Sequence, residues 1–278
     1  MNPYFTERVV AFIDILGFKE KVCCSINDAD CADKLHSSLQ YILSLKEENE
    51  NTATVMSLKK LGLEITTFSD SIVMSYPVEY QGALFTLLLD VIHLQLVLAC
   101  KGILIRGGIS IGSLFHDGNI VYGPAMNEAY ELESVYAKMP RVIIAKETIQ
   151  QGIEKTKLSH NSLQEETEYV LKLITEDDDG WLFVDILRQN SELTDEGSEY
   201  FYWLSILRNS IVENLNLYKD DVKIMEKYIW LKDYFNTVVR DKNAFYPVPE
   251  SFNIDEQRQF RCSYDDLAII EQPDGTFG

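Results

Sequence analysis

The first 145 residues alternate between short apolar segments and longer segments with helical spacing, and this alternation limits the fold more than any other feature. Val9 to Ile15 is a β-branched apolar run that ends just before Gly17, which predicts a buried central strand. Ala32 to Leu45 has helical spacing, with Leu35, Leu39, Ile42 and Leu45 on one face. Segments 61–68 and 72–76 are strand-like runs separated by three turn-forming residues, which predicts a hairpin.

The pattern continues beyond the hairpin. The next segments predict, in order, a helix, a strand, a turn, a short strand, a helix and a strand: 81–100, 103–111, 116–119, 120–122, 124–137 and 141–145. The resulting order, β-α-β-β-α-β with a further β-α-β, is that of a ferredoxin-like core with extensions. We therefore expect an α/β fold of the α+β sandwich type.

The second half is less regular and more acidic. Residues 161–200 hold 12 acids and 2 bases, and together with the polar run 156–167 they predict a domain boundary or a long insertion. We place one domain at 1–155 and a second at 156–278. In the second domain, the sequence predicts a hairpin of segments 169–174 and 181–187, helices at 199–218 and 220–240, and an extended tail from Pro247. We expect this C-terminal extension to pack on the first domain.

The net charge of −19 argues against partners that are nucleic acids or anionic membranes, because phosphate backbones attract Lys/Arg surfaces. A polyanionic ligand would need metal ions or a local basic pocket. The five cysteines form no CxxC pair, which favours reduced thiols in a cytoplasmic protein, and the N-terminus lacks the pattern of an export signal. The apolar segment 83–100 is interrupted by Asp90, His93 and Gln95, so a buried helix is favoured over a membrane span.

Two aspartates are the strongest candidates for chemistry. Asp14 interrupts the apolar first strand, where a carboxylate is costly unless it is paired, hydrogen-bonded or bound to metal. Asp70 lies at the tip of the predicted hairpin, and in a ferredoxin-like sheet this hairpin neighbours the first strand. A converging pair of carboxylates suits two Mg²⁺ or Mn²⁺ ions. The alternative is a strand-end Asp that caps a turn, together with an ordinary hairpin Asp.

Four segments together resemble the motifs of class III nucleotidyl cyclases. Phe12–Phe18 (FIDILGF) resembles their FxDIxGF strand and turn, and Thr67–Asp70 resembles the hairpin with their second metal Asp. Ile105–Gly112 is similar to their RxGIxxG strand, and Tyr122–Ala129 to their WGxxxNxA segment. Each motif is weak by itself, but the four occur in the order of the family.

The resemblance implies a homodimer with shared active sites, two Mn²⁺ or Mg²⁺ ions per site and cyclisation of a nucleoside triphosphate with release of pyrophosphate. It assigns metal binding to Asp14, Ile15 and Asp70, phosphate contacts to the turn with Gly17 and Phe18, and ribose orientation to Asn127. Such in-line phosphoryl chemistry requires positioning and charge neutralisation.

Several positions depart from the family pattern. Thr66 and Ile120 stand at the substrate-binding positions where adenylyl and guanylyl members read the purine, and neither residue makes a charged contact. Glu131 replaces the transition-state Arg, so Lys138 or Arg141 would have to supply that charge. The departures put purine recognition in doubt.

Longer strings, from FSDSIVMSYP through AKMPRVII to WLKDYFN, look like the pyrimidine cyclases of bacterial Pycsar anti-phage systems. This resemblance implies a uridylate cyclase that converts UTP to 3′,5′-cyclic UMP, with a separate effector protein that senses the product. Production of cyclic CMP from CTP is the first alternative, because no residue decides between the two pyrimidines. A nucleotide-binding regulatory protein with a degenerate site is the second. A diguanylate cyclase is excluded because no GG[DE]EF hairpin is present.

Some of these residues also have a structural explanation that requires no ligand. Asn127 lies near a predicted helix start and would serve there as a local cap. Lys138 and Arg141 would complement a helix C-terminus, and Arg106 on a central strand is expected to be an ion-pair partner. The four histidines lack metal-ligand spacing, which argues against zinc.

Overall fold

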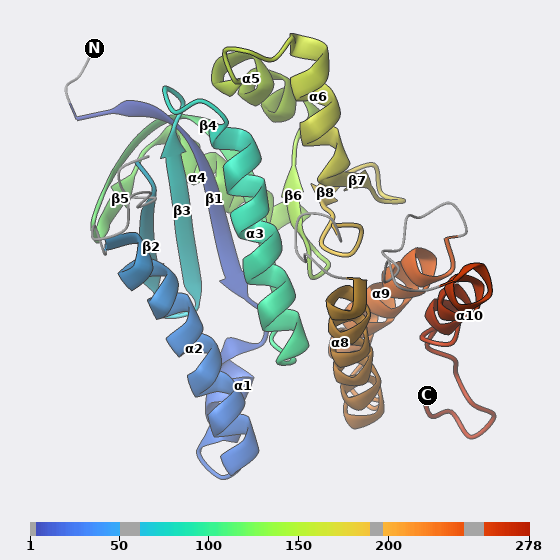
Figure 1. Ribbon diagram of the computed structural model, residues 1–278. Coiled ribbons are helices and arrows are strands. Elements are labelled where there is room, and N and C mark those ends of the chain that lie inside the picture. The colour runs from blue at the N-terminus through green and yellow to red at the C-terminus, as the bar shows by residue number, and fades with distance from the viewer. Residues whose placement is uncertain (1–3, 51–61, 190–196, 242–252) are drawn as a thin grey trace. The chain divides into compact units, whose positions relative to one another are not determined.

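The computed structural model describes residues 4–50, 62–189, 197–241 and 253–278, and its contacts divide the chain into two compact units (Figure 1). The first, here called the sheet unit, comprises Met1–Gln95 and Ile103–Asp185; the second, the helical unit, comprises Leu96–Gly102 and Ile186–Gly278. This division differs from the boundary expected after residue 155, and the extent of a catalytic domain stays a prediction.

The sheet unit is built on one mixed sheet with the strand order β2-β3-β1-β4-β6-β8-β7, and β5 pairs with β4. Its strands are β1 (Thr6–Ile15), β2 (Glu64–Phe68), β3 (Ser71–Pro77), β4 (Ile105–Asp117), β5 (Ile120–Tyr122), β6 (Val142–Ile144), β7 (Ile174–Glu176) and β8 (Leu182–Val184). The first four strands are antiparallel and have the order β2-β3-β1-β4, which confirms the ferredoxin-like core. β6 joins β4 in parallel, and the β7–β8 hairpin extends the sheet.

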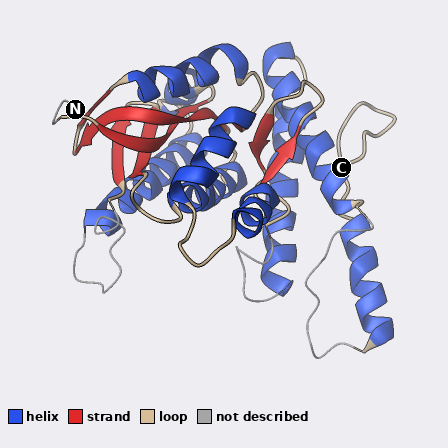
Figure 2. Ribbon diagram, turned by 90° about the horizontal axis from the view of Figure 1, so that it is seen from above, coloured by secondary structure: helices blue, strands red, loops and turns tan. Residues whose placement is uncertain are grey.

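Helices lie on both faces of this sheet, which confirms the sandwich (Figure 2). The helices of this part of the chain are α1 (Phe18–Ser25), α2 (Ala29–Glu50), α3 (Ala83–Cys100), α4 (Pro124–Glu131), the π-helix η2 (Leu132–Tyr136), α5 (Lys146–Thr156) and α6 (Leu163–Lys172). In Figure 1, α2 and α3 cross the near face of the strands and α4 lies behind them. Alternate β1 residues, Val10 and Phe12, pack with Ala125 and Ala129 of α4.

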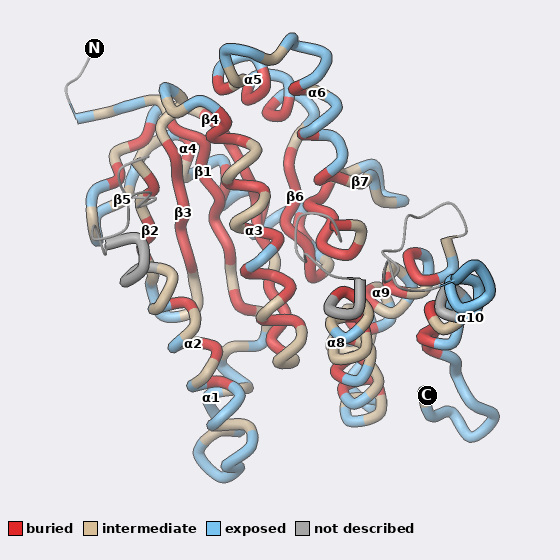
Figure 3. Tube along the Cα trace, in the orientation of Figure 1, coloured by how far each residue is buried: buried red, intermediate tan, exposed pale blue. Residues whose placement is uncertain are grey.

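The expected buried helix at 81–100 is confirmed as α3. Among the described residues it is the one helix that passes the length and apolarity criteria for a membrane span, and 61% of it is buried inside the structure. The central strands are also buried along most of their length (Figure 3). The apolar character of segment 83–100 is therefore that of a core helix.

Two sequence predictions of secondary structure were wrong. Segment 169–174 is mostly helical, because a capping box of Ser162 and Glu165 starts α6 and the apolar residues keep helical spacing up to Lys172. The tail predicted as extended contains α10 (Ile254–Asp265), which a capping box of Asn253 and Glu256 starts; residues 247–252 lie outside the described residues. In both cases the capping residues outweighed the composition of the segment.

The segment predicted as one helix at 124–137 is an α-helix in its first part and a π-helix in its second. α4 ends at Glu131, and η2 continues it as one π-helical turn. At Gly108 of β4, an added Cβ would lie 2.4 Å from Leu132 Cβ and 2.5 Å from the Ala129 carbonyl oxygen. The glycine therefore permits the close approach of this helix to the sheet.

The helical unit contains the expected aromatic-rich helices α8 (Gly197–Leu217) and α9 (Val222–Val239), followed by α10. Its buried side chains include Leu207 and Ile211 of α8 and Phe235 of α9. The Ser210 hydroxyl donates to the Ala99 carbonyl oxygen at 3.1 Å, so residues 96–102 belong to this unit by contact.

Candidate functional site

The fold brings Asp14 and Asp70 to the same end of the sheet. Asp14 is in register with Ser71 of β3 and with Arg106 of β4, and Asp70 directly precedes β3. The Ile15 backbone N–H donates to the Asp70 carbonyl oxygen at 3.0 Å, so the hairpin tip is tied to the end of β1. The expected neighbourhood of the first strand and the hairpin is therefore present.

Asp14 is half-buried, with 22% of its side chain exposed. Burial is the largest cause that raises the pKa of this carboxyl, and the negative charge of Asp70 raises the pKa further. Arg106 and a hydrogen bond from the Ser71 side chain act in the opposite direction and lower the pKa. Two carboxylates thus lie close enough to repel each other, an arrangement that a cation would relieve.

Glu133 is a site residue that the sequence reasoning missed. It lies on η2 with 3% of its side chain exposed, and its Oε1 is 2.5 Å from Arg106 Nε. The two atoms are not aligned as a hydrogen bond, so the attraction is one of opposite charge. Burial raises the pKa of Glu133, Arg106 lowers it, and Asp14 and Asp70 raise it. Four charged groups therefore form one electrostatic cluster, and the expectation that Arg106 is an ion-pair partner is confirmed.

The turn after β1 exposes backbone donors beside this cluster. Gly17 has φ 68° in the left-handed region, and it precedes α1 without a side-chain cap. The first N–H groups of a helix lack intrahelical partners and attract anions. Gly17 and Phe18 are thus placed where the phosphates were expected, and this assignment stays a prediction.

Thr66 and Ile120, the two positions expected to read the base, lie near each other. Thr66 of β2 is buried, and its Oγ1 is 2.5 Å from the carbonyl oxygen of Gly118 in the β4–β5 turn. Ile120 follows in β5 and is exposed. The fold thus brings Thr66 and Ile120, which are 54 residues apart in the sequence, into the same region. The Thr66 hydroxyl already forms hydrogen bonds with His116 and Gly118.

A hydrogen-bond chain fixes the orientation of that hydroxyl. Thr66 donates its single hydroxyl proton to the Gly118 carbonyl oxygen, so in the 2.9 Å contact its Oγ1 accepts from His116 Nε2–H. The neutral imidazole then accepts at Nδ1 from the Ser75 hydroxyl at 2.7 Å, and Ser75 Oγ accepts from Arg8 Nε at 2.7 Å. The chain runs from an obligatory donor to an obligatory acceptor, so Thr66 keeps acceptor capacity alone for any further partner.

The two candidate cations differ in their surroundings. Arg141 has 1% of its side chain exposed, and Asp177 and Asp179 bind its two terminal nitrogens. A phosphate would have to displace these two carboxylates of the β7–β8 turn before it could bind Arg141. Lys138 is exposed after η2, and so is Glu131 at the end of α4. The substrate roles of Lys138 and Arg141 stay predictions.

Asn127 is exposed on α4 and does not cap this helix. The N-cap is Gly123, with no side-chain hydrogen bond, and Pro124 follows as the first helical residue. The capping alternative for Asn127 is therefore wrong, which leaves its side chain available to a ligand.

The donor set at the end of β1 fits a hard divalent cation by its chemistry. Asp14 and Asp70 would supply carboxylate oxygens, which Mg²⁺ and Mn²⁺ prefer, and Ile15, whose carbonyl is the further expected ligand, directly follows Asp14 in the chain. Within the described ranges, no group of three or more His, Cys, Asp or Glu side chains is arranged to hold a metal ion. A metal at this site would therefore need further ligands from its substrate or from water.

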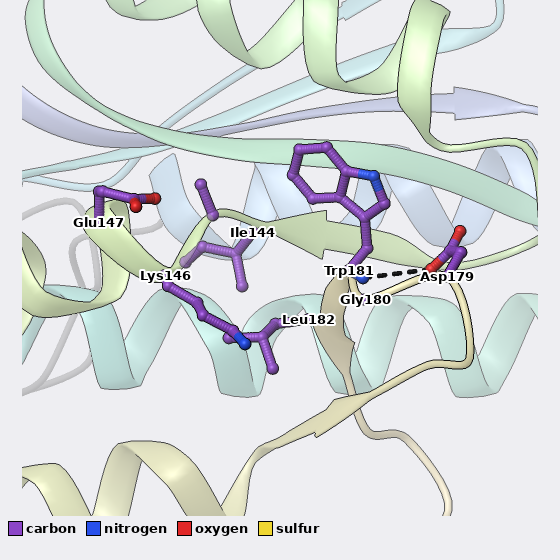
Figure 4. A pocket seen from close by; sticks show the side chains of 8 residues that line it. Ile144, Lys146, Glu147, Asp179, Gly180, Trp181 and Leu182 are labelled. Atoms are coloured by element: carbon purple, nitrogen blue, oxygen red, sulfur yellow. Dashed lines mark hydrogen bonds between the residues drawn. The ribbon is translucent and has the colours of Figure 1, made fainter.

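A separate hollow of about 320 Å³ lies between the end of β6, the start of α5 and β8 (Figure 4). Lys146, Glu147 and Trp181 line it, and the backbone N–H of Trp181 donates to Asp179 Oδ1 at 3.2 Å. None of the residues expected in the catalytic site lines this hollow.

The chain is similar in structure to several nucleotide cyclases. CyaB, an adenylyl cyclase from P. aeruginosa, is 17% identical, with a TM-score of 0.38 over 65% of this chain and 95% of that chain. A bacterial light-regulated adenylyl cyclase is 14% identical, with a TM-score of 0.38 over 75% and 100%. The catalytic core of a rhodopsin-guanylyl cyclase with converted specificity, in complex with ATPalphaS, is 17% identical, with a TM-score of 0.39 over 65% and 95%.

No family model and no curated protein matched the sequence. The structural similarities are low in identity and in TM-score, so they carry no argument about activity. The function is therefore argued from the residues and contacts of the site.

Proposed function

We propose that this protein is a metal-dependent pyrimidine nucleotide cyclase that converts UTP to 3′,5′-cyclic UMP and pyrophosphate. The observation that carries the proposal is the meeting of Asp14 and Asp70 at the end of β1, beside the turn that begins α1. The motif resemblance supplies the reaction class, and this convergence is the geometry that the reaction requires.

The proposed reaction forms one bond, breaks one bond and releases one proton. The ribose 3′-oxygen bonds to the α-phosphorus, the bond from the α-phosphorus to the oxygen bridging to the β-phosphate breaks, and the hydroxyl proton passes to solvent. Bound Mn²⁺ or Mg²⁺ would neutralise phosphate charge and increase the acidity of the 3′-hydroxyl.

The chain's own residues have distinct tasks in this proposal. Asp14, Asp70 and the Ile15 carbonyl hold the cations. The backbone donors of Gly17 and Phe18 contact the phosphates, and the exposed Asn127 side chain orients the ribose.

Thr66 and Ile120, the two positions expected to read the base, carry no charge, which agrees with the pyrimidine branch of the motif resemblance. Neither residue decides between the two pyrimidines, so CTP remains the alternative substrate. The resemblance to Pycsar cyclases favours UTP, and with it a cytoplasmic role in anti-phage defence through a separate effector that senses the product.

A homodimer with shared sites is part of the proposal. Large apolar side chains are exposed on β5, α4 and η2, which are elements next to the candidate site: Ile120, Tyr122, Tyr130, Val135 and Tyr136. Such a surface suits a second copy of the chain.

Incubation of the protein with UTP, CTP, ATP or GTP and Mn²⁺, followed by identification of the products, tests the proposal. We expect cyclic UMP and pyrophosphate, and loss of both by at least about a hundredfold in Asp14→Asn and Asp70→Asn. Asp30→Asn removes an exposed carboxylate from the first turn of α2 and serves as the matched control. Native turnover in Asp14→Asn would refute the metal assignment.

A second candidate is a nucleotide-binding regulatory protein without turnover. Two observations favour it: Glu131 stands at the position of the transition-state arginine, and Arg141 is bound by Asp177 and Asp179. Binding of UTP without release of pyrophosphate, at any of several Mn²⁺ concentrations, would establish this candidate.

A further inference from the structure

The contacts of Arg106 are unequal between its two acidic neighbours. Its Nε lies 2.5 Å from Glu133 Oε1 and 3.9 Å from Asp14 Oδ2. Because charge attraction decreases with separation, the guanidinium is held mainly by Glu133. Asp14 is left with a long contact to Arg106 and with the hydrogen bond from Ser71.

We propose that Glu133 is a positioning residue that draws Arg106 away from Asp14 and so keeps the Asp14 carboxylate available to a divalent cation. The inference rests on the proposed function, since it takes Asp14 as a cation ligand. It adds a role for a residue outside the motifs that suggested the cyclase. Without Glu133, Arg106 would pair fully with Asp14 and compete with the cation for the same oxygens.

The local structure that places Glu133 is specific. The π-helical turn η2 follows α4, and the backbone N of Glu133 would lie 3.1 Å from a Cβ at Gly108. A buried acid at this point is stable only opposite a cation, which is Arg106 at 27% side-chain exposure. The same guanidinium thus neutralises Glu133 inside the fold and borders Asp14 at the surface.

The competition predicts opposite effects for two neighbouring substitutions. Glu133→Gln keeps the shape of the side chain but releases Arg106 towards Asp14, so Mn²⁺ binding should weaken by about tenfold or more. Arg106→Gln removes the competing cation, so Mn²⁺ binding should be retained or become tighter. The double variant Glu133→Gln/Arg106→Gln should recover at least the wild-type affinity.

The experiment is calorimetric titration of the full chain with Mn²⁺ in the absence of nucleotide. Glu131→Gln removes the same charge two residues earlier, from an exposed position. It measures how much the loss of one negative charge weakens Mn²⁺ binding without releasing Arg106. In parallel, the Arg106 Nε–H resonance is followed by NMR as Mg²⁺ is added. It should respond strongly in Glu133→Gln, as the ion displaces the guanidinium from Asp14, and weakly in the wild type.

Each outcome decides the inference. If Glu133→Gln binds Mn²⁺ as the wild type does, or if the double variant stays as weak as the single variant, Glu133 does not position Arg106 for this purpose. If the wild type binds no Mn²⁺ and Asp14→Asn changes nothing, the proposed function fails and the inference fails with it. Should Glu133→Gln not fold, as judged by circular dichroism, weaker Mn²⁺ binding in Arg106→Gln overturns the inference by itself.

Discussion

At the scale of single residues, most buried charges in the sheet unit have an identifiable partner. Arg8 donates to Ser75, Arg141 is bound by two aspartates, and Arg106 by Glu133. A buried guanidinium is costly without such neighbours. These pairs depend on strands and loops distant in sequence, so neither partner of a pair predicts the other.

Asp90 of α3 is a half-buried acid with a neutral partner, and this makes stability depend on pH. It accepts a hydrogen bond from the Tyr76 hydroxyl at 2.8 Å, and burial raises the pKa of Asp90 to about 6 from an ordinary 3.8. The folded state therefore holds this proton more tightly than the unfolded state does. The contribution of Asp90 to stability is greatest below pH 3.8 and declines as the pH rises to about 6.

Asp90→Asn should remove this dependence. We expect the variant to be more stable than the wild type by about 1–3 kcal/mol at pH 7.5, with the difference vanishing near pH 4. Urea unfolding at both pH values measures the difference. Asp220→Asn, at an exposed position, is the matched control, and a wild-type advantage at pH 7.5 would contradict the shift.

At the scale of elements, β4 approaches α4 and η2 most closely at Gly108. Gly107 and Gly108 adjoin Arg106, and an added Cβ at Gly108 would collide with Leu132 and with the Ala129 carbonyl. Gly112, four residues along the same strand, has Ala125 Cβ at an ordinary 3.6 Å. The two glycines thus differ in the space around them although both lie in one strand.

Gly108→Ala should therefore destabilise the fold by about 2–4 kcal/mol, because η2 and α4 must move away from the sheet. Gly112→Ala should change the free energy of unfolding by less than about 1 kcal/mol. Thermal unfolding of both variants measures this difference. Equal effects at the two positions would show that the close approach of η2 to β4 is not tight.

At the scale of the whole molecule, the proposed dimer predicts how assembly depends on the apolar surface beside the site. Val135→Glu would bury a charge in that interface, so the variant should be monomeric and lose cyclase activity. Leu217→Glu alters an exposed apolar residue at the end of α8 and is the matched control. Light scattering with size exclusion gives the mass, and a dimeric Val135→Glu protein would place the interface elsewhere.

The sequence predicted the elements better than their details. Period and composition identified β1, the β2–β3 hairpin, α3 and the core strand order, because each buries a regular apolar pattern. They failed at 169–174, where a cap and helical period overrode strand-like composition, and they did not predict that a π-helical turn follows α4. The motifs identified Asp14 and Asp70, but no motif signalled Glu133 or the His116 hydrogen bonds.

Local period and turn residues act over a few positions, so the order of amino acids was enough to predict the succession of strands and helices and a carboxylate in the first strand. Which charges meet depends instead on how distant segments pack. Arg106 borders both Asp14 and Glu133 because β4 pairs with β1 and packs against η2, and Arg141 is enclosed because the β7–β8 turn reaches it. Electrostatic interactions act through space, so their partners follow from packing rather than from distance along the chain.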